Sequence, residues 1–130
     1  FHLFDRLYGL RHVDRERVTA ELTRVRLQNK VHIEDGGRFS TLDLSSGQRK
    51  RLALAVGLLE DRPVLVFDEW AAEQDPDFRR HFYEDILPSL RAEGRTIIAA
   101  THDDRYFKIA DQIVKLEAGQ VVAPPAARAE

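Results

Sequence analysis

Two adjacent carboxylates, Asp68 and Glu69, directly follow a short apolar run in this chain. The run, Val64 to Phe67, is continuous rather than alternating, which is typical of a strand covered on both faces in a parallel sheet. Open α/β sheets bind ligands beyond the carboxyl ends of such strands. Mg²⁺ takes one or two carboxylates together with phosphate oxygens and waters. The acidic pair is therefore suited to holding Mg²⁺ and to positioning or deprotonating a water, which phosphoryl transfer requires.

A histidine follows the next predicted strand. Residues 96–100, TIIAA, form a second apolar run, and Thr101, His102 and Asp103 come directly after it. A lone histidine at a strand end is more often structural, but this one lies one strand beyond the acidic pair, which favours a functional role. Its imidazole could hydrogen-bond a γ-phosphate or an attacking water. The other four histidines show no metal-ligand spacing.

A polar turn, LSSGQ at residues 44–48, precedes an apolar segment. Ser45 or Ser46 can cap a helix that opens near Gly47, and the glycine allows a ligand to approach the backbone. The free amides and the helix dipole favour a phosphate there. Alone, such a turn is usually only a cap; the acidic pair farther along the chain favours a binding role. Residues 52–59 are apolar nearly all round, which predicts a buried helix.

Three further elements must position these groups. Asp14 is expected to cap an amphipathic helix that runs to about Lys30. The sequence Asp35-Gly36-Gly37 predicts a turn or hairpin. Asp75 before Pro76 predicts a helix start, and that helix repeats an apolar side chain every fourth residue, at Phe78, Phe82, Ile86 and Leu90. Pro88 is expected to kink or shorten this helix, and Gly94 to cap its end.

Composition excludes several classes of protein. The 130 residues are 43% hydrophobic and 32% charged, with a formal charge of −2, which gives no electrostatic case for a nucleic-acid partner. No apolar run approaches the roughly 20 residues of a membrane span. The chain has no cysteine, which fits a cytosolic protein. Because it begins at Phe1 within apolar sequence (a stripe over residues 1–10), we expect a fragment whose upstream part is missing.

Taken together, these motifs resemble the ATP-binding domain of ABC transporters, in its C-terminal part. Residues 44–48 resemble the signature motif, and residues 64–69 resemble the Walker B strand. Asp75 and His102 stand where the family has its D-loop aspartate and switch histidine. More narrowly, four segments resemble bacterial cyclic-peptide and siderophore exporters of the syringomycin and pyoverdine type: FHLFDRLYGL, LSSGQRKRLAL, DEWAAEQDPDFRRHFYEDILP and THDDRYF. Two positions depart from the family pattern: Ser46 replaces a common glycine, and Trp70 a usual proline.

The resemblance implies an α/β fold, namely part of a P-loop NTPase. A helical subdomain with the signature would cover residues 1–59, the C-terminal half of a RecA-like, mostly parallel core residues 60–123, and a tail residues 124–130. It implies an ATPase that uses ATP and Mg²⁺. Asp68 would act through the metal, Glu69 as general base, and His102 on the γ-phosphate. Ser45, Ser46, Gly47, Gln48 and Asp75 would serve the nucleotide site of a partner subunit.

The implied partners are a second copy in a head-to-tail dimer, a transmembrane domain fused upstream, and an exported peptide or siderophore. The protein would lie at the cytoplasmic face of the bacterial inner membrane. No G-x-x-x-x-G-K-[ST] motif occurs in the 130 residues, so we expect this segment to be inactive alone. Two alternatives remain open: a soluble ABC-type ATPase of DNA repair or translation, and a non-catalytic interaction module, against which intact Asp68, Glu69 and His102 argue.

Overall fold

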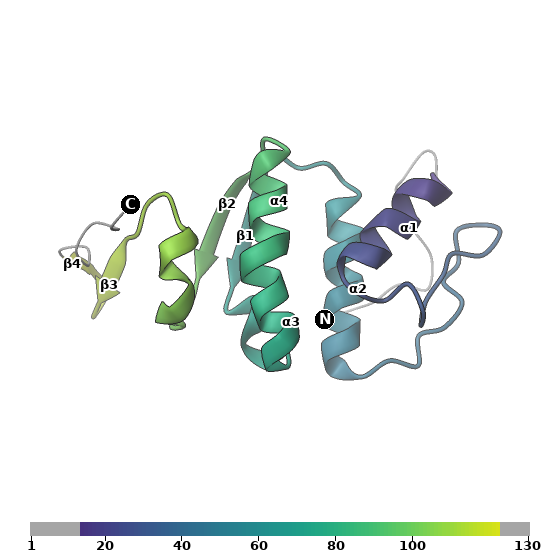
Figure 1. The fold of residues 1–130 in the computed structure, drawn as a ribbon, viewed down its shortest axis with the longest axis horizontal. Coiled ribbons are helices and arrows are strands. Elements are labelled where there is room, and N and C mark those ends of the chain that lie inside the picture. The colour runs from purple at the N-terminus through teal and green to yellow at the C-terminus, as the bar shows by residue number, and fades with distance from the viewer. Residues whose placement is uncertain (1–13, 123–130) are drawn as a thin grey trace. The chain divides into compact units, whose positions relative to one another are not determined.

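The computed structural model describes residues 14–122, and the chain divides into two compact units, Phe1–Pro63 and Val64–Glu130 (Figure 1). The apolar stripe predicted over residues 1–10 and the tail predicted over residues 124–130 lie outside the described residues. The predicted domain boundaries, after residues 59 and 123, remain predictions. Among residues 14–122, no helix is both long enough and apolar enough to cross a membrane.

The first unit opens with helix α1, Arg15–Arg24. Asp14 caps it as predicted, because its carboxylate accepts hydrogen bonds from the backbone amides of Glu16 and Arg17. The prediction that the helix reaches Lys30 is wrong. Arg26 adopts a left-handed backbone conformation, with φ +59°, which an α-helix cannot contain, and the chain turns away there.

The polar turn of this unit leads into helix α2, Ser46–Leu58. Before it, the predicted hairpin is present as a single antiparallel bridge between Ile33 and Phe39, closed by Gly36 and Gly37 at positive φ. In the stretch predicted to be buried, residues 52–59, five residues are buried and the rest are half-buried. The arginine Arg17 on α1 donates to the Leu58 carbonyl, 3.3 Å away, and pairs with Asp61, which ties α1 to the end of α2.

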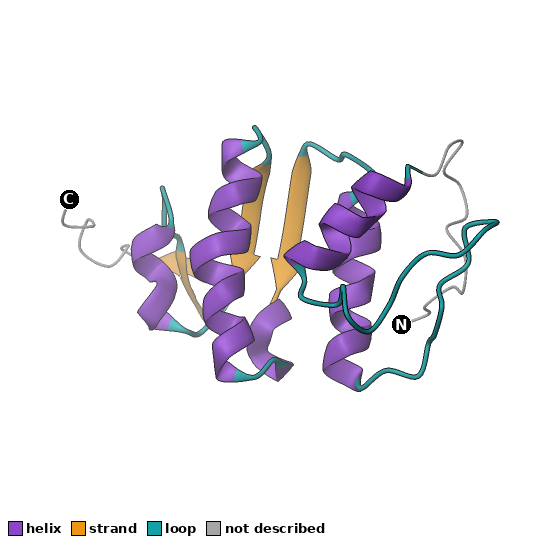
Figure 2. Ribbon diagram, turned by 45° about the vertical axis from the view of Figure 1, so that its right-hand side comes forward, coloured by secondary structure: helices purple, strands orange, loops and turns teal. Residues whose placement is uncertain are grey.

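The second unit is built on two parallel strands, β1 (Val64–Asp68) and β2 (Thr96–Ala100). They pair in register from Val64 opposite Thr96 to Asp68 opposite Ala100, so both carboxyl ends lie at one edge of the sheet. The helical segment between them lies along one face of the pair (Figure 2). This is a βαβ unit, the local arrangement that places strand-end side chains together.

The prediction that these strands are covered on both faces is wrong for the described residues. Phe67 points toward the helix and is 7% exposed, whereas Val66 and Ile98 on the opposite face are 69% and 56% exposed. The helical segment covers one face of β1 and β2, and within residues 64–122 of this unit no second layer covers the other. The continuous apolar run therefore presents half of its side chains to the outside of the unit.

One long helical segment connects the strands. It consists of α3 (Pro76–His81), the π-helical turn η2 (Phe82–Ile86) and α4 (Leu87–Ala92). The predicted apolar face is confirmed, since Phe78, Phe82, Ile86 and Leu90 are each at most 1% exposed. Pro88 does not end the helix, because it lies at the start of α4 where the π turn already alters the hydrogen-bond pattern. Gly94, with φ +91°, closes it as predicted.

The buried ring of Phe82 is central to this unit. It stacks on Trp70 with centroids 4.6 Å apart and meets Phe67 edge-on at 5.3 Å. Phe82→Ala is expected to lower the free energy of unfolding of the protein by about 3–5 kcal/mol, through lost burial and the cavity left behind. Urea unfolding followed by circular dichroism measures this. Glu84→Ala, an exposed neighbour on η2, is the control, and an equal loss in both variants would contradict the prediction.

After β2 the chain forms the 3-10 segment η3 (Asp104–Ile109). A small antiparallel hairpin follows, with β3 at Lys115–Glu117 and β4 at Gln120–Val122. Its turn is Ala118-Gly119, with both residues at positive φ.

Candidate active site

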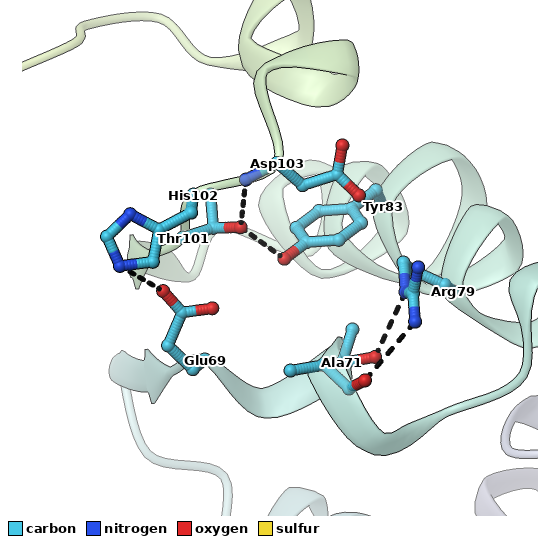
Figure 3. A pocket seen from close by; sticks show the side chains of 8 residues that line it. Glu69, Ala71, Arg79, Tyr83, Thr101, His102 and Asp103 are labelled. Atoms are coloured by element: carbon cyan, nitrogen blue, oxygen red, sulfur yellow. Dashed lines mark hydrogen bonds and ion pairs between the residues drawn. The ribbon is translucent and has the colours of Figure 1, made fainter.

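Parallel pairing brings Glu69 and His102 together. The register ends at Asp68 opposite Ala100, and the Glu69 amide continues the ladder by donating to the Ala100 carbonyl at 2.9 Å. Beyond this point the two segments diverge. Glu69 lies one residue past the end of β1, and His102 lies two residues past the end of β2. His102 Nε2 lies 3.3 Å from Glu69 Oε1 (Figure 3). The carboxylate and the imidazole are therefore in direct contact at the carboxyl edge of the sheet.

Glu69 is held in an unfavourable backbone conformation. Its φ of 49° and ψ of 35° lie in the left-handed region, which side chains other than glycine rarely adopt. Such a conformation costs on the order of 1–3 kcal/mol and recurs at active sites, where the surrounding structure must hold it. The turn directs the Glu69 side chain, 38% exposed, toward His102, whose ring is 99% exposed. Both groups are open to a ligand arriving at the strand ends.

Asp68 has the properties of a ligand for a hard cation. It ends β1 and is exposed, and within residues 14–122 its carboxylate makes no hydrogen bond or ion pair. No group of three or more His, Cys, Asp or Glu side chains suited to a metal occurs in the described part of the chain. A single available carboxylate fits Mg²⁺, which keeps most of its coordination for phosphate oxygens and waters. It does not fit a metal enclosed entirely by protein ligands.

A cavity of about 340 Å³ adjoins the Glu69–His102 pair. Besides these two residues it is lined by Ala71, Ala72, Arg79, Tyr83, Thr101 and Asp103 (Figure 3). Sequence reasoning assigned no role to Arg79, Tyr83, Thr101 or Asp103. The available signal was weak: Arg79 and Tyr83 are polar residues four apart beside the apolar face of a helix, the spacing of one helical turn.

Burial and hydrogen bonding shift two pKa values at the cavity. Arg105 binds Asp103 through two nitrogens, Nε at 2.8 Å and Nη2 at 2.7 Å. These hydrogen bonds hold the pKa of Asp103 below its usual value, against the effect of partial burial. Burial raises the pKa of Tyr83, and the hydrogen bond to Thr101 only partly opposes this. Tyr83 is therefore protonated, and its hydroxyl is a donor, at neutral pH.

The Asp103–Arg105 pair predicts a pH dependence. Because the folded-state pKa of Asp103 is lowered, its ionised form stabilises the fold above the unfolded value of about 3.9. That contribution is lost as the pH falls through the lower, folded pKa. Melting temperatures of the wild type and Asp103→Asn are expected to differ above about pH 4 and to converge below it. Arg105→Gln should give the same pattern, and a pH-independent difference would contradict the assignment.

The segment that follows Glu69, residues 70–75, forms the 3-10 turn η1 (Trp70–Glu73) followed by a helix cap. Trp70 is half-buried and packs among Phe67, Phe78 and Phe82. The carboxylate of Asp75 accepts from the Phe78 amide at 2.9 Å and caps α3. The predicted cap is confirmed; any role of Asp75 toward a partner subunit stays a prediction.

The residues of the polar turn lie in the other compact unit, at the start of α2. Ser45 is the cap: its hydroxyl accepts from the Gln48 amide at 3.1 Å, and Gln48 Oε1 accepts from the Ser45 amide at 3.0 Å. Ser46 is the first helical residue and Gly47 the second. The capping box satisfies two backbone amides of the first turn. It also fixes the backbone conformation of Ser46 and Gly47 at the start of the helix.

The described part of the second unit is a parallel strand pair with an acidic edge, joined by one helical crossover. A solved bacterial Atm1-family ABC exporter with ATP bound has this fold. The match covers 93% of the present chain and 23% of the exporter chain, with a TM-score of 0.73 and 21% sequence identity. The predicted α/β class and ABC-ATPase fold are thus confirmed.

Sequence relatives agree with the fold. A family model described as "AAA domain, putative AbiEii toxin, Type IV TA system" matches residues 2–106. The chain belongs to this AAA domain family, and its relatives are ATP-binding proteins of ABC transporters. The ATP-binding protein SyrD of Pseudomonas syringae pv. syringae is 49% identical over 95% of the chain and 22% of SyrD.

Two other relatives extend the comparison. The thiamine import ATP-binding protein ThiQ of Jannaschia sp. is 36% identical over 84% of the chain and 45% of ThiQ. The ATP-dependent lipid A-core flippase of Burkholderia orbicola is 36% identical over 84% of the chain and 19% of the flippase. The chain therefore spans about one fifth of SyrD and of the flippase, and less than half of ThiQ.

Proposed function

We propose that this chain is the C-terminal part of the nucleotide-binding domain of a bacterial ABC exporter that couples ATP hydrolysis to export of a cyclic peptide or siderophore. The observation that carries the ATPase assignment is the 3.3 Å contact between His102 Nε2 and Glu69 Oε1 at the carboxyl ends of β1 and β2. The assignment to export rests on the resemblance to cyclic-peptide exporters and on 49% identity to SyrD. The relatives ThiQ and the lipid A-core flippase are named for import and for flipping of a lipid. Their names do not favour the alternative, a soluble ATPase of DNA repair or translation.

The chemistry is hydrolysis of the γ-phosphate bond of ATP. The Glu69 carboxylate accepts a proton from a water as the water oxygen bonds to the γ-phosphorus, and the bond to the ADP oxygen breaks. His102 donates a hydrogen bond to a γ-phosphate oxygen and thereby orients it. Asp68 would hold Mg²⁺, which when bound neutralises charge on the phosphates. The open position of all three side chains leaves room for a nucleotide.

The remaining site residues serve a second copy of the domain. In a head-to-tail dimer, Ser45, Ser46, Gly47 and Gln48 at the start of α2 would contact the nucleotide held by the partner subunit, where the helix dipole favours phosphate. Asp75 would couple the two sites, and two-fold symmetry makes both sites equivalent. Because the P-loop is not among the 130 residues, we expect the segment alone to bind ATP weakly.

In the cell, closure and opening of this dimer would drive a transmembrane domain, at the cytoplasmic face of the inner membrane. A nucleic-acid partner is not proposed, since the net charge is −2. The test is ATP hydrolysis and peptide or siderophore uptake by inside-out vesicles that contain the intact protein. We expect both to require Mg²⁺, to stop with EDTA, and to fall with Asp68→Asn but not with Asp111→Asn. Uptake of neither cargo class, or hydrolysis in EDTA, would contradict the proposal.

A further inference from the structure

Arg79, on α3, holds the chain segment that follows Glu69. Its Nε donates to the Ala71 carbonyl at 3.2 Å, and its Nη2 donates to the carbonyls of Ala72 at 3.2 Å and Gln74 at 3.0 Å. Figure 3 shows the guanidinium directed at this backbone across the cavity. A planar guanidinium can satisfy three divergent carbonyls at once, which an ammonium group on a flexible stem cannot do with fixed geometry. Arg79 thus fixes η1, which begins directly after Glu69.

Tyr83, one helical turn beyond Arg79, holds the other side of the site. Its hydroxyl donates to Thr101 Oγ1 at 3.1 Å, and the same oxygen accepts from the Asp103 amide at 3.0 Å. Thr101 and Asp103 are the residues on either side of His102. The ring of Tyr83 is buried and stacks on Tyr106 with the ring centroids 4.5 Å apart, so packing holds the hydroxyl in position. The His102 loop is therefore fixed by its backbone neighbours.

We propose that Arg79 and Tyr83 are positioning residues, which together set the distance between Glu69 and His102. This rests on the proposed ATPase function. His102, whose side chain is 99% exposed, is not held by packing, and Glu69 occupies a left-handed backbone conformation that needs support from its surroundings. Two side chains at i and i+4 lie on one side of a helix. The same helical segment therefore holds both the backbone that follows Glu69, through Arg79, and the loop that carries His102, through Tyr83.

Catalysis depends on such placement, since a displacement of about 1 Å arising outside the reacting groups can cost on the order of 10²-fold in rate. Tyr83→Phe removes one hydroxyl and keeps the ring. We expect it to lower kcat by about 2- to 10-fold, the equivalent of one hydrogen bond, with KM for ATP unchanged. Arg79→Lys loses the three-way contact and should lower kcat by about 10- to 100-fold. Thr101→Val removes both hydrogen bonds to this oxygen and should lower kcat at least as much as Tyr83→Phe, whereas Thr101→Ser keeps the hydroxyl and should keep the wild-type rate.

The experiment measures kcat and KM for ATP in the intact exporter. Tyr106→Phe is the matched control for Tyr83→Phe, because among the described residues its hydroxyl makes no hydrogen bond; Arg80→Gln, exposed on α3, is the control for Arg79→Lys. The decisive comparison repeats Tyr83→Phe in a His102→Ala background. If Tyr83 acts by positioning His102, it has no further effect there, whereas a general loss of stability lowers both backgrounds equally.

Each outcome decides the matter. A kcat loss from Tyr83→Phe that is confined to the background with His102, together with a rate lowered in Thr101→Val and kept in Thr101→Ser, supports the positioning role. Tyr83→Phe indistinguishable from Tyr106→Phe, or an equal loss in both backgrounds, overturns it while the ATPase assignment stands. Full hydrolysis in Glu69→Gln would overturn the catalytic assignment itself, and the positioning role with it. The two failures are thus distinguished by whether Glu69→Gln is inactive.

Discussion

Replacing Glu69 by glutamine in the intact protein is expected to lower kcat for ATP hydrolysis by about 10²–10⁴-fold, the usual contribution of a general base. Glutamine has nearly the same shape and can keep the contact with His102 Nε2, which lies 3.3 Å from the carboxylate oxygen. It cannot accept a proton from water. Binding of ATP should therefore survive the change, and dimers closed around ATP should accumulate because opening depends on hydrolysis.

Two measurements check this result: phosphate release under steady-state conditions, and size-exclusion chromatography of the ATPase domain with ATP. Glu73→Gln is the matched control, since Glu73 is an exposed glutamate four residues farther along the chain, in η1. We expect it to hydrolyse ATP at the wild-type rate. Retained hydrolysis in Glu69→Gln would show that another group accepts the proton and would remove the basis for the active site described above.

Replacing His102 by alanine is expected to lower kcat by about 10²–10³-fold, as for loss of one preorganised hydrogen-bond donor to a reacting oxygen. The loss should be smaller than for Glu69→Gln, because the general base remains in place. His102 is the most exposed partner of the pair, so its removal leaves no cavity and should not alter the melting temperature. A rate loss without a stability loss is the distinguishing result.

The control for this variant is His32→Gln, an exposed histidine in the first unit. Both variants are compared by kcat, by KM for ATP and by thermal unfolding. His102→Asn tests the role further, since its side-chain amide is a donor of shorter reach and should recover part of the rate. Equal activity of His102→Ala and the wild type would mean that the contact with Glu69 has no catalytic importance.

The local elements follow from the sequence because short-range forces decide them. Asp14, Ser45 and Asp75 are short polar side chains before helical segments, and each caps the helix expected of it. Phe78, Phe82, Ile86 and Leu90 recur every fourth residue and form the buried face that this spacing predicts. The length of α1 was not predictable in this way, because a single left-handed residue, Arg26, ends it.

The candidate site divides in the same manner. Asp68, Glu69 and His102 were identified from their position after apolar runs, since parallel strands bring their carboxyl ends to one edge. That Glu69 touches His102 required the register of β1 on β2, which no local pattern specifies. The prediction that both faces of these strands are covered was wrong, because the apolar residue types alone do not show whether a second layer packs on the sheet.

The sequence by itself determined the family, the helix caps, the apolar faces and the identity of the acidic and histidine side chains. Only the tertiary structure decided that Arg79 reaches three carbonyls of the segment after Glu69, and that Tyr83 reaches the threonine before His102. The partners of Arg79 lie five to eight residues back along the chain, and the partner of Tyr83 lies 18 residues ahead. These hydrogen bonds depend on how separate elements of the fold pack, whereas caps and periodicity are set within one helix.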